Sequence, residues 1–124
     1  MPTRGVRGAT TANANTCDAI LEATRELLIA LIQANSLYEE DVASIYFTMT
    51  PDLNAAFPAA AARALGWKEV ALLDAQAPHV ANDVPHCIRV LIHWNARYAQ
   101  QEPCHVYLRE ARRLRPDRAG LLNS

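Results

Sequence analysis

One segment of this chain is long enough to form a helix of several turns and has apolar residues at helical spacing, whereas every other regular segment is short. Between residues 16 and 35, apolar side chains recur at helical spacing and define one broad face: Ile20, Leu21, Leu27, Leu28, Leu31 and Ile32. Thr16 can cap the start of this helix, and Asn35 can end it in the left-handed region. The other segments are mostly strand-like, so we expect this helix to cover a sheet.

Five short runs have the composition of β-strands, and they span residues 3–9, 42–49, 68–73, 87–94 and 104–108. A second, short helix is expected to begin at Pro58, which fits the first helical position, and to end at Gly66. Segment 74–85 is expected to be irregular, because its two prolines oppose regular pairing. The pattern predicts an α+β class: a mixed five-stranded sheet with one long and one short helix on one side.

The length and composition fit one soluble globular domain. The chain has 124 residues, of which 51% are hydrophobic and 20% are charged, as is usual for a domain with one core. We expect a single domain over residues 1–124, with a flexible end over 118–124. The net charge of −1 provides no basic field that would attract nucleic acid or an anionic membrane.

The cysteines and the N-terminal composition predict a cytoplasmic protein. Cys17, Cys87 and Cys104 are odd in number and lie far apart, which argues against a disulfide framework or a zinc site. The first residues contain no apolar signal core, and no segment approaches the length of a membrane span. The four histidines show no metal-binding spacing, so we expect no metal site.

Arginine dominates the basic residues, with eleven arginines against the single Lys68. A GC-rich coding bias can account for much of this excess, but it does not choose positions. Arg7 lies in a glycine-flanked strand, Arg63 on the short helix, Arg89 inside an apolar run and Arg115 before a proline. A guanidinium stays charged and binds a carboxylate through two parallel donors. Convergence of these arginines would therefore form a receptor for a small, multiply charged anion.

The individual candidates leave alternatives open. Arg89 lies within CIRVLI and needs a partner or a ligand if it is buried, unless strand alternation turns it to solvent or an acidic residue pairs with it. The glycines beside Arg7 could let a ligand or another backbone approach closely, and Tyr107 could be a core aromatic or a ligand contact. The chain shows no obvious nucleophile, because Cys87 has the setting of a core residue with an inert thiol.

Four sequence blocks occur in a fixed order over residues 3–118: RGVRGATTANANT, TPDLNAAFPAAAARALGW, CIRVLI and HVYLREARRLRPD. In order and spacing they resemble the small monofunctional chorismate mutases of the AroH type. The resemblance implies a compact α+β chain that assembles as a homotrimer, a pseudo-α/β barrel. Its three active sites would lie in clefts between neighbouring subunits.

The resemblance also implies the reaction. Enzymes of this family convert chorismate to prephenate, the branch step toward phenylalanine and tyrosine, without cofactor or metal. The reaction is a pericyclic rearrangement of one substrate, which would explain why no nucleophile is evident. The protein has to select the reactive conformer and stabilise charge as the ether C–O bond breaks. The implied partners are chorismate and further copies of the chain, with no nucleic acid and no membrane.

The resemblance implies roles for three residues at the reacting part of the substrate. Arg89 matches the arginine that faces the breaking ether oxygen, and we expect it to be the most sensitive position. Arg7 and Tyr107 match the pair that holds a substrate carboxylate.

Other residues would complete the binding site. Phe57 and Arg63 match residues supplied by the adjacent subunit, and Ala59 lies in the same segment. Leu114 and Arg115 match the C-terminal residues that close over the ligand.

Three departures from the family pattern concern the site. A usual lysine is replaced by Ala60, a usual cysteine by Asp74, and the glutamate of the usual M-Q-E-M by Ala77. That glutamate would accept the substrate hydroxyl and orient the key arginine. Either Asp74 supplies the missing carboxylate and pairs with Arg89, or the site has diverged toward another chorismate-like ligand or weaker activity. We expect compensation, and so count Asp74 among the catalytic residues and Ala77 among the binding residues.

Overall fold

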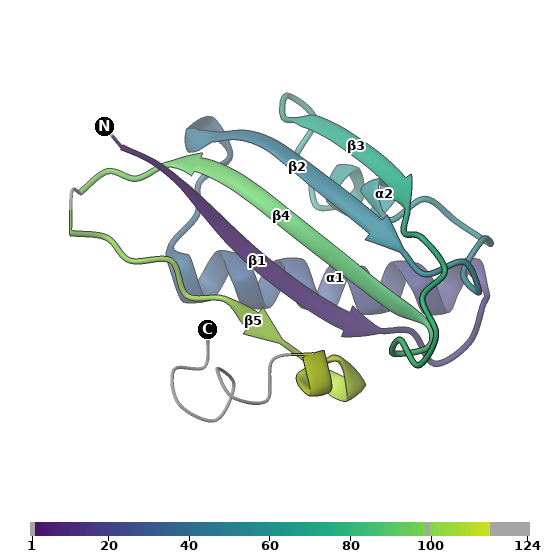
Figure 1. Ribbon diagram of the computed structural model, residues 1–124. Coiled ribbons are helices and arrows are strands. Elements are labelled where there is room, and N and C mark those ends of the chain that lie inside the picture. Colours follow the sequence, from purple (N-terminus) through teal and green to yellow (C-terminus); the bar gives the residue numbers. More distant parts are fainter. Residues whose placement is uncertain (1, 99, 115–124) are drawn as a thin grey trace.

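The computed structural model describes residues 2–98 and 100–114 as a sheet with helices against it (Figure 1). Along the chain the elements are β1 (Thr3–Thr11), α1 (Cys17–Asn35), the 3₁₀ turn η1 (Glu39–Asp41), β2 (Val42–Met49), α2 (Ala59–Ala64), β3 (Ala71–Gln76), β4 (Cys87–Asn95), β5 (Val106–Tyr107) and the 3₁₀ helix η2 (Arg109–Leu114). No helix in these ranges is long and apolar enough to cross a membrane.

The five strands form one mixed sheet in the order β3-β2-β4-β1-β5. Strand β4 is antiparallel to both β1 and β2, whereas β3 runs parallel to β2 and β5 runs parallel to β1. Of the helices described, α1 crosses behind the sheet and α2 lies behind β3, so both cover the same face (Figure 1). The predicted mixed five-stranded sheet with one long and one short helix is confirmed.

Side-chain alternation along β4 separates a core face from an open face. The core face carries four buried side chains that pack on the helix side: Ile88, Val90, Ile92 and Trp94. The residues between them, including Arg89 and Leu91, point to the opposite face because successive strand residues alternate. On the neighbouring strands, Arg7 is paired with Leu91, and Thr48 is paired with Arg89. These residues therefore share the open face.

Gly8 of β1 lets α1 approach the sheet closely. A Cβ atom at this position would lie 2.8 Å from Cδ1 of Leu31 and 3.2 Å from the main-chain oxygen of Val106. The first distance is too short for a real carbon contact, so the Leu31 side chain would have to move to admit a side chain at Gly8. The close approach that the sequence suggested near Arg7 is thus made by α1 and by the backbone of β5.

The predicted caps of the helices are mostly confirmed. The Thr16 hydroxyl accepts a hydrogen bond from the main-chain N–H of Ala19 and caps α1. Pro58 precedes α2, and Gly66 follows it with a φ of 97°. The end of α1 was predicted one residue too early, because Ser36, with a φ of 52°, adopts the left-handed conformation instead of Asn35.

Asn35 instead fastens the loop that leads to β5. Its amide nitrogen donates to the main-chain oxygens of Leu31 and Cys104, each at 3.0 Å, and its amide oxygen accepts from the Cys104 N–H at 2.7 Å. Both main-chain groups of Cys104 are thereby bound by a side chain and not by a strand. This explains why β5 has two residues, although a strand over 104–108 was predicted.

Strand β3 begins and ends three residues later than predicted. It spans Ala71–Gln76, and its pairing with Ser44–Met49 of β2 extends through the first three residues of the segment predicted to be irregular. The main-chain N–H of Ala77 continues this pattern by donating to the oxygen of Met49 at 2.8 Å. Pairing with β2 therefore overrides the weak local signals here, and it places Asp74 inside a strand.

Candidate active site

A cavity of about 460 Å³ opens on the face of the sheet opposite α1 and α2. Strands β1, β2, β4 and β5 and helix η2 supply its lining: Arg7, Gly8, Ala9, Tyr46, Thr48, Arg89, Val90, Leu91, Tyr107 and Leu114. Four of the predicted site residues thus lie together, namely Arg7, Arg89, Tyr107 and Leu114. Arg115 lies outside the described residues.

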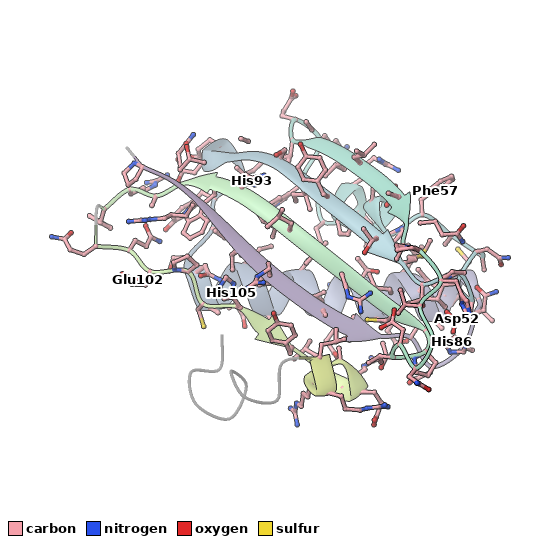
Figure 2. All side chains as sticks on the ribbon, in the orientation of Figure 1. Asp52, Phe57, His86, His93, Glu102 and His105 are labelled. Carbon is pink, nitrogen blue, oxygen red and sulfur yellow. The ribbon has the colours of Figure 1, made fainter. Side chains whose placement is uncertain are left out.

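Arg7 is held at the middle of β1, and the segment before β5 is tied to it. The main-chain N–H of Arg7 donates to Nδ1 of His105 at 2.9 Å, so this ring nitrogen carries no proton in the contact. His105, labelled in Figure 2, lies two residues before Tyr107. Tyr107 itself pairs with Ala9 in the parallel ladder between β1 and β5. These contacts fix Tyr107 near Arg7.

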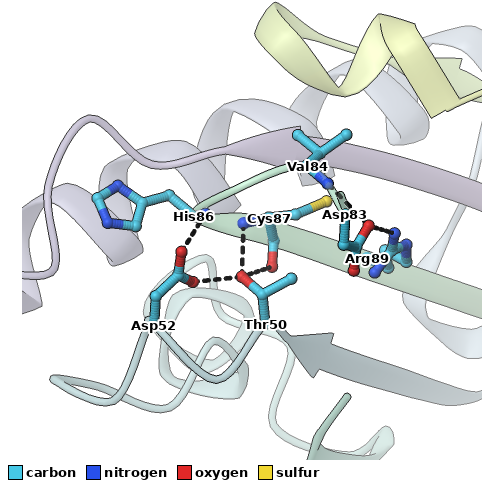
Figure 3. A network of polar contacts seen from close by, with 7 residues as sticks. All are labelled: Thr50, Asp52, Asp83, Val84, His86, Cys87 and Arg89. Carbon is cyan, nitrogen blue, oxygen red and sulfur yellow. Dashed lines mark hydrogen bonds and ion pairs between the residues drawn. The ribbon is translucent and has the colours of Figure 1, made fainter. Parts of the chain in front are cut away.

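Arg89 forms an ion pair with Asp83, a residue for which the sequence analysis proposed no role. Nη2 of Arg89 lies 2.9 Å from Oδ1 of Asp83, and the two side chains are 34% and 21% exposed (Figure 3). The hydrogen bond from Arg89 lowers the pKa of Asp83 below its ordinary value of 3.8. Arg89 therefore has an acidic partner, which was one of the alternatives open from sequence.

A network of polar contacts fixes the start of β4 beside this pair (Figure 3). The Thr50 hydroxyl donates to Asp52 at 2.5 Å and accepts from the main-chain N–H of Cys87 at 2.9 Å. The other Asp52 oxygen accepts from the N–H of His86 at 2.9 Å, and His86 has a φ of 52°. The turn that leads into β4 is thus bound at several points, and the backbone that carries Arg89 is restrained.

Cys87 offers no thiolate for catalysis. Its side chain is fully buried, and burial raises the pKa of the thiol to about 11, although the nearby charge of Arg89 acts in the opposite direction. A thiol with this pKa stays protonated at neutral pH and is a poor nucleophile. The structure therefore supports the interpretation of Cys87 as an inert core residue.

Asp74 does not meet Arg89 within the chain, which corrects the predicted pairing for a single subunit. Asp74 is paired with Phe47, a core-facing residue of β2, whereas Arg89 is paired with Thr48 on the open face. Oδ1 of Asp74 instead accepts from the main-chain N–H of Ala59 at 2.9 Å, at the start of α2. The Asp74 carboxylate therefore binds the start of α2, whereas the carboxylate that pairs with Arg89 belongs to Asp83.

Burial dominates the titration of Asp74. It raises the pKa of the carboxyl group above 3.8, while the N–H of Ala59 and the charge of Arg63 act in the opposite direction. Asp74 also lines a second hollow, of about 340 Å³, together with Phe57. Phe57 is 69% exposed and lies near the end of β3 (Figure 2).

The remaining predicted residues lie at the β3 side of the sheet. Ala59 is buried and Arg63 is exposed, both on α2. Ala77 directly follows β3, and its methyl group offers no hydrogen bond to a substrate or to an arginine. The predicted site residues therefore form two separate groups in one chain, one around the 460 Å³ cavity and one around Phe57.

The comparisons with known proteins agree on one family. The family model for chorismate mutase type I matches residues 3–118. The chorismate mutase AroH of Thermus thermophilus is 50% identical over 115 residues, which cover 92% of this chain and 94% of that protein. This chain belongs to the chorismate mutase type I family. The chorismate mutase AroH of Bacillus subtilis (strain 168) is 41% identical over 118 residues, which cover 94% of this chain and 93% of the relative.

A solved structure has the same fold as this chorismate mutase type I chain. A chorismate mutase from Clostridium thermocellum superposes with a TM-score of 0.85 at 43% identity, covering 88% of this chain and 97% of the other. Within residues 2–98 and 100–114, no group of three His, Cys, Asp or Glu side chains is placed to hold a metal ion.

Proposed function

We propose that this protein is a chorismate mutase, an isomerase that converts chorismate to prephenate. The observation that supports this most directly is the placement of Arg7 and Arg89 on antiparallel neighbours, β1 and β4, at one cavity. Two guanidinium groups at one cavity match a dianionic substrate, because one can hold a carboxylate while the other faces the reacting atoms. Tyr107 adds a hydroxyl at the same cavity.

The chemistry requires placement and charge, and no nucleophile. In the rearrangement an ether C–O bond breaks while a C–C bond forms within the same molecule. No proton or electron passes to the protein. Negative charge grows on the ether oxygen as the bond breaks, and a guanidinium aimed at that oxygen stabilises the transition state more than the ground state. We assign this part to Arg89, and carboxylate binding to Arg7 and Tyr107.

The complete site is proposed to form between copies of the chain in a homotrimer, a pseudo-α/β barrel. The sheet order puts β3 at one edge and β5 at the other, and the two groups of site residues line separate hollows. A neighbouring copy can bring its Phe57 and Arg63 to the cavity that holds Arg89. Exposed apolar side chains agree with such a contact, since Leu73 is 56% and Tyr46 is 41% exposed.

A diverged protein that binds a related ligand without mutase activity is the less favoured alternative. It rests on the replacement of the usual glutamate by Ala77. The 50% identity with a chorismate mutase over 92% of the chain favours the same reaction.

Turnover of chorismate tests the activity. The purified protein, incubated with chorismate, should consume it and produce an equal amount of prephenate, at a rate that a metal chelator does not change. Tight binding of chorismate without prephenate would support the diverged alternative, and neither binding nor turnover would contradict both.

Subunit complementation tests the shared site. Arg89→Ala and Arg63→Ala proteins, each weakly active alone, are unfolded together at equal amounts and refolded. After random mixing, about a quarter of all interfaces would carry both intact halves, so activity should rise well above the mean of the parents. A mixture no more active than the parents would place the whole site within one subunit.

A further inference from the structure

Asp83 is the acidic residue that contacts Arg89, and its surroundings hold it in place. The Asp83 main-chain N–H donates to the oxygen of Val80 at 3.2 Å, which closes a turn. Asn82, inside that turn, adopts the left-handed conformation with a φ of 65°. Val84, the next residue along, is 4% exposed and packs in the small cluster with Cys87. The carboxylate therefore lies on an anchored segment.

The Asp83 carboxylate makes two bonds through the same oxygen. Oδ1 accepts from Nη2 of Arg89 at 2.9 Å and from the main-chain N–H of Val84 at 2.8 Å (Figure 3). The bond from the Val84 N–H fixes the orientation of the carboxylate. The carboxylate in turn restrains the Arg89 guanidinium through its contact with Nη2. A guanidinium has five N–H donors, so donors of Arg89 remain for a ligand after this contact.

Two other acidic residues could have served Arg89, and both are engaged elsewhere. Asp74 accepts from Ala59 on the helix side of the sheet. Asp52 lies in the adjoining turn, where its two oxygens accept from Thr50 and His86. The geometry therefore favours Asp83 as the partner of Arg89.

We propose that Asp83 is the positioning residue for Arg89, and that it takes over the orienting part expected of a carboxylate at position 77. This inference rests on the proposed function, in which Arg89 acts on the substrate. Asp83 itself need not touch the substrate. Its part is to hold a long, flexible side chain in the reactive direction before chorismate arrives.

The sign of the effect separates positioning from a simple field effect. Removing the negative charge of Asp83 makes the surroundings of Arg89 more positive, which by itself would stabilise negative charge on the ether oxygen. Removing the contact also frees the arginine rotamers, which lowers the fraction of time that the guanidinium points correctly. Positioning therefore predicts a slower enzyme, and a field effect alone predicts a faster one.

Asp83→Asn is the informative variant. The amide oxygen of asparagine can still accept from the Val84 N–H, so the turn is kept. The negative charge that holds the Arg89 guanidinium is lost, and any remaining hydrogen bond to Nη2 becomes a weaker, neutral one. Asp41→Asn is the matched control, because Asp41 forms an ion pair of 2.6 Å with Arg97, and neither residue lines the cavity. Asp83→Glu restores the charge with one more methylene and should recover part of the loss.

We expect Asp83→Asn to lower kcat about tenfold, with a smaller change in KM, because the loss concerns alignment in the transition state. Asp41→Asn should change kcat by less than about twofold. An unchanged or higher kcat in Asp83→Asn overturns the proposal, as does an equal loss in Asp41→Asn.

A second measurement decides independently of turnover. In nitrogen-15 NMR, rotation of the Arg89 guanidinium should be slow in the wild-type protein and fast in Asp83→Asn. Equal rotation in both proteins overturns the positioning role whatever the kinetics show. A wild-type protein that does not convert chorismate would contradict the proposed function alone, and the NMR result would still decide the role of Asp83.

Discussion

Strand β3 and the loop before β4 each contribute one aspartate near the proposed site, and the two aspartates have opposite surroundings. Asp74 on β3 is half-buried, binds the start of α2, and has a raised pKa. Asp83 in the loop binds a cation, and the pKa of its carboxyl group is lowered. The strand residue Asp74 was the predicted partner of Arg89, and the structure favours the loop residue Asp83.

The difference shows that the side of the sheet matters more than distance along the chain. A strand residue can reach only the groups on its own face, and a shift of one position reverses the face. Asp74 stands beside Phe47 and therefore belongs to the core side, away from Arg89. A loop residue has no such restriction, so Asp83 can turn back to the open face.

The largest expected effect is the loss of the Arg89 charge. Arg89→Ala should lower kcat by roughly 10²- to 10³-fold or more, because one well-aimed donor in a catalytic site is worth about 3–4 kcal/mol of barrier. Arg97→Ala is the control, since Arg97 lies in an exposed ion pair with Asp41, and it should remain within about twofold. Steady-state kinetics with chorismate check both, and a mild loss in Arg89→Ala would contradict the assigned role.

Asn35 fastens the segment before β5, and its loss should mainly affect stability. Asn35→Ala removes the bonds to Cys104 and leaves partly buried main-chain groups without these partners, so the free energy of unfolding should fall by about 1–3 kcal/mol. Chemical denaturation measures this change. Gln33→Ala is the control at an exposed position of the same helix, and it should change the free energy of unfolding by no more than about 0.5 kcal/mol.

The Asp74 carboxylate should act as a helix cap. Asp74→Ala should lower the free energy of unfolding by about 1 kcal/mol, whereas Asp74→Asn keeps an oxygen for the Ala59 N–H and should retain most of it. The raised pKa sets the sign of the pH dependence: the folded state binds the proton more tightly, so ionisation weakens the wild-type protein. The free energy of unfolding of Asp74→Asn should therefore increase relative to that of the wild-type protein as pH rises from 3.8 through the folded pKa.

The Asp83 ion pair should contribute least to stability, with the opposite pH dependence. Its lowered pKa means that its contribution is present above 3.8 and is lost as pH falls through the folded value. Because both side chains are partly exposed, the free energy of unfolding of the wild-type protein should be higher than that of Asp83→Asn by only about 0.2–1 kcal/mol at pH 7. Urea denaturation at pH 7 and at pH 3 measures this difference in the free energy of unfolding. A difference in favour of the wild-type protein that is larger at pH 3 than at pH 7 would contradict the ion pair.

Local patterns were sufficient for most of the fold. The apolar spacing of α1, the Thr16 cap and the strand at Val42–Met49 all follow from short-range physics, and the structure confirms them. The errors fall where distant contacts decide. Pairing with β2 moves β3 by three residues, and the side chain of Asn35 shortens β5. Neither interaction has a local signal.

The site was predictable in part. The resemblance to chorismate mutases placed Arg7, Arg89 and Tyr107 together, and the structure brings them to one cavity. Asp83 was missed because its role depends on a turn that folds back toward β4. A signal was present, since Asp83 is the only acidic residue between Asp74 and Arg89 in the sequence. The trimer, the cytoplasmic location and the domain limits stay predictions.

Carbon-13 NMR titration of the two carboxyl groups, in wild type and in Arg89→Met, tests most directly which aspartate serves Arg89. The account predicts that Asp83 titrates below 3.8 and Asp74 above it. In Arg89→Met the pKa of Asp83 should rise, while that of Asp74 should stay unchanged. An Asp74 that titrates below 3.8 in the assembled protein and responds to Arg89→Met would contradict the account and restore Asp74 as the partner, across a subunit interface.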